Sequence, residues 1–137
     1  MSKDSKDLVG ADALTAWFGR WPSFHDAEIL SVELNRAGTS CVRIHTWNMT
    51  TDLNATGGYK IDKHCVVLFL LEQISDLELA DFSGQNVIFG LQIEKHDAGY
   101  RLELSPCYGL AGYLVAKSIE IKFEPGIPIE NKGRFGS

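Results

Sequence analysis

The stretch Trp21-Pro22-Ser23-Phe24-His25-Asp26-Ala27-Glu28 marks the point where a helical pattern ends and a strand pattern begins. Pro22 fixes its own φ and disfavours the α conformation at Trp21, so a helix must end there. From Ala27 onward, apolar and polar side chains alternate, which is typical of a half-buried strand. We therefore expect a corner that anchors one helix on a sheet, built by Trp21, Pro22, Phe24, His25 and Asp26.

A short amphipathic helix is expected before this corner. One apolar stripe at helical spacing is formed by Leu14, Trp17, Phe18 and Trp21. Asp12 is a candidate N-terminal cap, and Gly19 lies where a C-terminal cap is expected. Because three of the four stripe residues are large aromatics, we expect the helix to lie across a sheet.

Strand patterns dominate the rest of the chain. The expected strands are residues 27–34, 41–49, 64–71, 87–94, 100–105 and 119–124, with residues 76–82 as an edge strand or an extended connector. In the second of these, Val42, Ile44 and Thr46 share one face, and Arg43, His45 and Trp47 share the other. This order predicts an α+β fold, an N-terminal helix packed on a mostly antiparallel sheet of six or seven strands.

The chain reads as one domain over residues 1–137, without an internal repeat or linker. Residues 1–7 and 127–137 are expected to be loose termini, and residues 50–63 an exposed loop. The longest apolar run, residues 65–71, is far shorter than the roughly 20 residues that cross a bilayer. The N-terminus has no apolar signal segment, so a cytoplasmic protein is expected. An odd number of cysteines, without a C-x-x-C pair, predicts no disulfide framework.

The net charge of −5 is concentrated in the second half, where residues 69–137 carry −4. An acidic surface argues against nucleic acid or an anionic membrane as partner, because phosphates are bound by Lys and Arg. It suits a basic protein partner, although mild acidity also serves solubility alone. The charge distribution does not indicate an oligomeric state.

His25-Asp26 invites an acid–base interpretation, since a carboxylate can orient an imidazole. Adjacent residues rarely point the right way for this, and no nucleophile motif accompanies them. At a corner, the Asp26 carboxylate can instead accept backbone N–H groups, and His25 can bond a carbonyl. A small enzyme or ligand-binding domain that uses His25 and Asp26 in a pocket under the helix is the alternative, and we expect no catalytic residue.

No metal or cofactor site is expected. The four histidines and three cysteines show none of the short ligand spacings, and Gly57-Gly58 lacks a phosphate-binding pattern. Glu94 and Glu103 should face each other across the hairpin on its polar side. A solvated face explains that pair better than glycosidase chemistry, which needs a cleft.

The remaining candidate is an acidic partner-binding surface. Its residues would be Asp76, Glu78 and Asp81, joined by Asp52 and Asp62 from the long loop. A run of charge is most often only a solvated face.

The eight-residue corner, placed after a short aromatic helix, resembles the bacterial immunity protein 50 family of polymorphic-toxin systems. A looser likeness covers residues 100–124, which include Cys107-Tyr-Gly-Leu-Ala-Gly112. The resemblance implies a small cytoplasmic α+β protein that binds and neutralises a cognate toxin domain by blocking it, without catalysis. It implies no particular toxin-contact residues. A third interpretation is a dimerisation or scaffold module that uses an edge strand.

Overall fold

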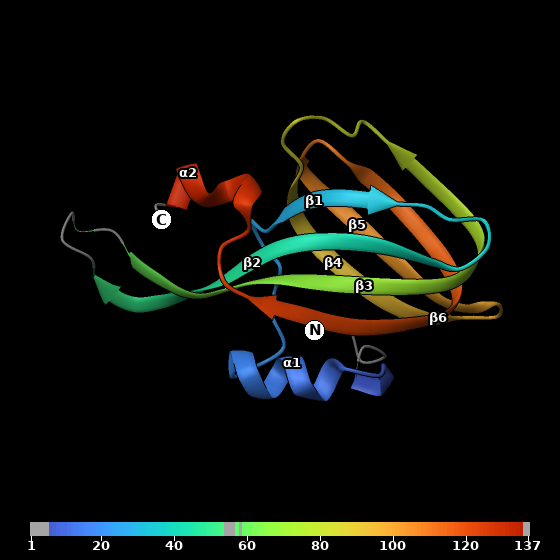
Figure 1. Cartoon of the computed structure of the whole chain (residues 1–137), viewed down its shortest axis with the longest axis horizontal. Helices are drawn as coiled ribbons and strands as arrows, with labels where there is room; N and C mark the ends of the chain where they lie inside the picture. The colour runs from blue at the N-terminus through green and yellow to red at the C-terminus, as the bar shows by residue number, and fades with distance from the viewer. Residues whose placement is uncertain (1–5, 54–56, 58, 136–137) are drawn as a thin grey trace.

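The computed structural model describes residues 6–53, 57 and 59–135 (Figure 1). In chain order the elements are α1 (Ala11–Phe18), β1 (Glu28–Glu33), β2 (Thr39–Leu53), β3 (Tyr59–Ala80), β4 (Val87–His96), β5 (Gly99–Tyr108), β6 (Ala111–Pro125), the 3-10 helix η2 (Ile129–Asn131) and α2 (Lys132–Phe135). The predicted α+β fold, an N-terminal helix packed on an antiparallel sheet, is confirmed. Among the described residues, no helix has the length and apolar character needed to cross a membrane.

The sheet closes on itself as a barrel in the order β1-β2-β3-β6-β5-β4, with antiparallel neighbours throughout. The closure between β1 and β4 is short. The Ile29 N–H donates to the Asn86 carbonyl at 2.8 Å, and the Ile88 N–H donates to the Ala27 carbonyl at 2.8 Å. The corner therefore leads directly into the seam that closes the barrel.

β3 is one 22-residue strand that unites two segments expected to be separate. It bends at Gln73, which has a φ of 53°, and at a bulge between Ile74 and Asp76. The sequence patterns of the two halves differ because the first pairs with both β2 and β6, whereas the second pairs with β6.

The expected loop over residues 50–63 is shorter than predicted, since β2 continues to Leu53 and β3 begins at Tyr59. The two strands project from the barrel as a long hairpin (Figure 1). The sequence did not predict this extension because its residues are mostly polar and do not alternate with apolar ones. Strands can still pair there, since backbone hydrogen bonds need no apolar side chains.

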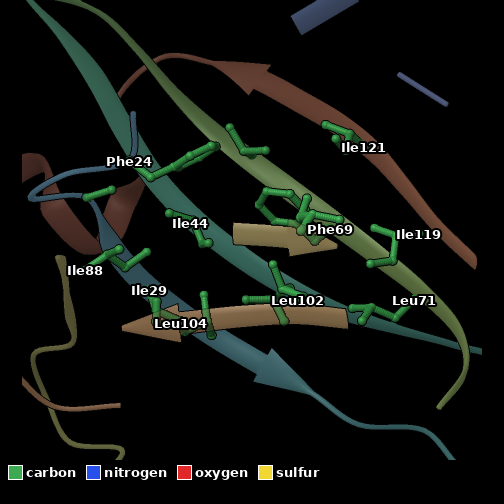
Figure 2. Packing of buried hydrophobic residues seen from close by; sticks show 14 of the residues in the cluster. Phe24, Ile29, Ile44, Phe69, Leu71, Ile88, Leu102, Leu104, Ile119 and Ile121 are labelled. Atoms are coloured by element: carbon green, nitrogen blue, oxygen red, sulfur yellow. The ribbon is translucent and has the colours of Figure 1, made fainter. Parts of the chain in front are cut away.

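Alternate strand residues fill the barrel interior. Side chains from opposite walls converge there, among them Phe24, Ile44, Phe69 and Leu102 (Figure 2). Val42 and Ile44, which were predicted to share one face of β2, are both fully buried. Small barrels are packed cores of this kind, which leaves chemistry and binding to the outer surface.

α1 covers the part of β6 that β5 leaves unpaired. β5 pairs with residues 112–116 of β6, and further along the Ile121 N–H donates to the Val9 carbonyl at 2.8 Å. Leu14 and Phe18 are buried, and the Trp17 ring lies 5.3 Å from Phe123 of β6. The helix packs beside β6 (Figure 1).

The ends of α1 are set by two glycines. Gly19 is the C-terminal cap, as predicted, with a φ of 96° and its N–H bonded to Thr15. The prediction that Asp12 caps the other end is wrong: Gly10 is the N-cap, and Asp12 lies in the first turn. Gly10 has a φ of 93°, and a Cβ there would lie 1.8 Å from the Ile121 carbonyl oxygen. Only glycine fits so close to β6.

The C-terminal segment, expected to be loose from Ile127, instead folds as η2 and α2 within the part described, up to Phe135. Asn131 is buried, and the Arg43 guanidinium of β2 donates to the Glu130 carboxylate at 2.8 Å. Polar anchors hold this segment, which is why apolar periodicity gave no sign of it.

Candidate protein-binding surface

The corner packs its aromatic side chains into the core. Phe24 is 1% exposed, with its ring 5.8 Å from Phe69 of β3, and Trp21 packs edge-on against Phe24 at 5.8 Å. Phe24 and Asp26 both have positive φ, 60° and 67°. The Asp26 N–H donates to the Ile88 carbonyl at 2.8 Å, which ties the corner to β4.

His25 and Asp26 lie on the surface. Their side chains are 53% and 56% exposed, and His25 Nε2 lies 3.6 Å from Asp26 Oδ1. His25 Nδ1 lies 3.1 Å from the Phe89 carbonyl oxygen, and because a carbonyl can only accept, Nδ1 carries the proton. An exposed pair of this kind lacks the enclosed, water-poor surroundings in which imidazole and carboxylate become an acid–base couple.

A second histidine, His45, is fully buried on the outer face of β2 beneath the C-terminal segment. The Asn131 amide Nδ2 donates to His45 Nδ1 at 2.8 Å, so His45 carries its proton on Nε2. That nitrogen lies 3.0 Å from His64 Nδ1, which accepts. The three side chains thus form a chain of hydrogen bonds from the C-terminal segment to β3.

Burial, and to a lesser extent the neighbouring His64, lower the pKa of His45 to about 4. Burial also lowers the pKa of His64. Both rings are therefore neutral near pH 7. Within the described ranges, no group of three or more His, Cys, Asp or Glu side chains is arranged to hold a metal ion.

The five acidic residues proposed from the sequence do not form one surface. Asp62 lies at the far end of β3 from Asp76, where it accepts a hydrogen bond from the Asn48 amide at 3.1 Å. The intervening strand would span about 45 Å if straight, at roughly 3.3 Å per residue. Asp81 follows β3 with a φ of 66°. The side chain of Asp52 lies outside the described part of the chain.

Asp76 and Glu78 instead join two carboxylates from other strands. Tyr113 of β6 pairs with Glu78 on one side and with Glu103 of β5 on the other, and Arg101 of β5 pairs with Glu94 of β4. These cross-strand pairs share the outer face of the barrel. We call this surface the acidic wall; it comprises Asp76, Glu78, Glu94, Glu103, Arg101 and Tyr113.

An aromatic–cation pair lies at the centre of the acidic wall. The Arg101 guanidinium lies 4.0 Å from the centre of the Tyr113 ring, and 3.8 Å from the Glu103 carboxylate. The Tyr113 hydroxyl donates to the Asp76 carboxylate at 3.2 Å, and this bond raises the pKa of Tyr113, so the phenol keeps its proton. Tyr and Arg are the residue types that most often anchor protein interfaces.

The sequence predicted Asp76 with Glu78, and separately Glu94 facing Glu103. The register corrects the second pair: Glu94 lies opposite Arg101 and Glu103 opposite Gln92, so the two glutamates are diagonal neighbours on one face. Joining the two pairs requires the strand order β3-β6-β5-β4, which single-strand patterns do not contain. Tyr113 and Arg101 carried no signal of their own, because one aromatic and one cation on a polar face are ordinary.

The family model described as Immunity protein 50 matches residues 10–123, from the start of α1 to near the end of β6. Since the match covers most of the chain, the chain belongs to the Immunity protein 50 family. The C-terminal segment that contacts His45 lies outside the matched region. No curated protein and no solved structure matches the chain.

Proposed function

We propose that this chain is a cytoplasmic immunity protein of a bacterial polymorphic-toxin system, and that it neutralises a cognate toxin domain by binding it without catalysis. Membership of the Immunity protein 50 family supports the class of function. The observation that carries the mode of action is the acidic wall, in which four carboxylates surround the Tyr113–Arg101 pair.

The wall suits a toxin domain with a basic surface. Clustered carboxylates attract such a partner over a range of about 10 Å at moderate salt and so raise the association rate. Arg101 and Tyr113 then supply rigid contact area where the two proteins meet. Covering a basic active surface blocks the toxin both sterically and electrostatically.

Charge reversal on the wall tests this proposal. The partner would be the toxin domain encoded immediately upstream of the gene for this chain, with its affinity measured by titration calorimetry. Glu78→Lys combined with Glu103→Lys should weaken binding on the order of 100-fold, because two attractive contacts become repulsive. Cells that express the toxin domain should lose protection in parallel.

The matched control is Glu120→Lys combined with Glu124→Lys. Both residues are exposed on β6 at the end opposite Tyr113, and the change in net charge is the same. This control should bind within a few-fold of the wild type. Equal losses in the two double variants would show that only total charge matters, and would refute the wall as the binding surface.

A further inference from the structure

The second half of β3 has an edge that no other strand covers. The ladder between β2 and β3 ends at the pair Thr39–Glu72. Beyond it, within the part of the chain that the structure describes, β3 pairs only with β6. We call residues 73–80 the open edge of β3. Its backbone groups on the side away from β6 are available to a further strand, which is how sheets recruit extended segments.

An apolar groove lies at the end of this edge. It has a volume of about 320 Å³ and is lined by Val32, Leu34, Leu79, Asp81, Phe82 and Leu110. Leu34 is 48% exposed and Phe82 is 56% exposed, so the tip of β1 and the residues after β3 present apolar surface to water. Exposed apolar side chains that border an unpaired strand edge are typical of a surface that binds a peptide.

The two faces of the open edge differ in character. Leu77 and Leu79 share the face that continues into the groove, whereas Asp76 and Glu78 share the face of the acidic wall. A strand added here would have its own side chains alternate in the same way. It would place apolar side chains beside Leu77 and the groove, and basic side chains beside the two carboxylates.

A second copy of this chain fits the edge poorly. Antiparallel pairing of two such edges about Leu77 would place Asp76 of each copy opposite Glu78 of the other. Like charges directly opposite each other destabilise a strand pair. The charge of the edge thus favours a basic segment from a different protein.

We propose that the open edge and the groove bind an extended segment of the toxin domain, with alternating apolar and basic side chains, as an added β-strand. This inference rests on the proposed function and specifies its binding mode. The acidic wall and the open edge share Asp76 and Glu78, so one partner can engage both.

Hydrogen exchange on the complex with the upstream-encoded toxin domain tests the added strand. Backbone amides in residues 73–80 that point away from β6 should exchange at least about tenfold more slowly in the complex than in the free chain, because new ladder hydrogen bonds protect them. Slowed exchange on the outer face of β5 and β6, with residues 73–80 unchanged, would overturn the inference and leave the proposed function standing.

Phe82→Asp and Phe89→Asp form a matched pair for the groove. Both phenylalanines are exposed, at 56% and 62%, and only Phe82 lines the groove. Phe82→Asp should weaken binding of the toxin domain at least about tenfold, whereas Phe89→Asp should bind like the wild type. Equal affinities for the two variants would contradict the inference, and failure of the wild type to bind would contradict the proposed function with it. A wild-type dimer that Phe82→Asp dissociates would assign the groove to a second copy instead.

Discussion

At the scale of single residues, Phe24 rather than Trp21 is the buried aromatic side chain of the corner. Spacing along the expected helix placed Trp21 on the apolar stripe, but α1 ends at Phe18, so Trp21 no longer follows helical geometry. Trp21 is half-buried, and Phe24 is 1% exposed in a left-handed conformation. The spacing of apolar residues could not predict the left-handed conformation of Phe24, because an argument from spacing assumes a regular helix or strand.

His45 should make the stability of the fold depend on pH. Its pKa is about 4 when folded, below the ordinary value near 6.5, so the unfolded chain binds more protons between these limits. The stabilisation is complete above about pH 6.5 and is lost as the pH falls toward 4. We expect the free energy of unfolding to fall by about 2 kcal/mol from His45 alone between pH 7 and pH 5, measured by urea unfolding.

His45→Gln is the control for this prediction. Glutamine can accept a hydrogen bond from Asn131 but has no proton to gain in this range. The variant should be less stable than the wild type at pH 7 and should vary less between pH 7 and pH 5. Parallel pH curves for the two proteins would show that the buried imidazole does not control acid stability.

At the scale of elements, the attachment of α1 to β6 depends on Gly10. Gly10→Ala should destabilise the fold by about 2 kcal/mol or more, because the added Cβ would collide with the Ile121 carbonyl in addition to adopting positive φ. Gly38→Ala is the matched control: it also has positive φ, 101°, but nothing lies within 4 Å of its Cβ position. Equal losses of thermal stability in the two variants would mean that the close approach to β6 contributes nothing.

Strands in which apolar and polar residues alternate could be predicted from the sequence. Segments whose structure depends on contacts with distant parts of the chain could not. The hairpin of β4 and β5 was predicted correctly because both strands alternate around a turn containing Gly99. The continuity of β3 was missed because the regular alternation is interrupted at Gln73 and at the bulge between Ile74 and Asp76, so its two halves were expected as separate segments. The C-terminal segment was missed because polar contacts to Arg43 and His45 hold it.

The acidic wall, likewise, could be predicted from the sequence only in part. Its members could be proposed in pairs along the chain, since each pair lies on one strand or one hairpin. Their assembly around Tyr113 required the pairing of β6 between β3 and β5, a long-range fact of topology. Asp62 was grouped with them by charge alone, and the structure separates it to the other end of β3.

At the scale of the whole molecule, the barrel interior is filled by side chains, so function belongs to the exterior. The core residues from all six strands are nearly inaccessible to water. The acidic wall, the open edge of β3 and the groove lie next to one another on the outside. A fold of this design can present a large, rigid binding surface at little conformational cost.

The stoichiometry of neutralisation tests the central claim most directly. The activity of the proposed cognate toxin domain would be measured with increasing amounts of this chain. A blocking protein should remove activity in linear proportion and abolish it at one chain per toxin domain, independent of incubation time. Complete loss of activity at a small fraction of one equivalent, growing with time, would reveal turnover and contradict the account, as would full toxin activity at several equivalents.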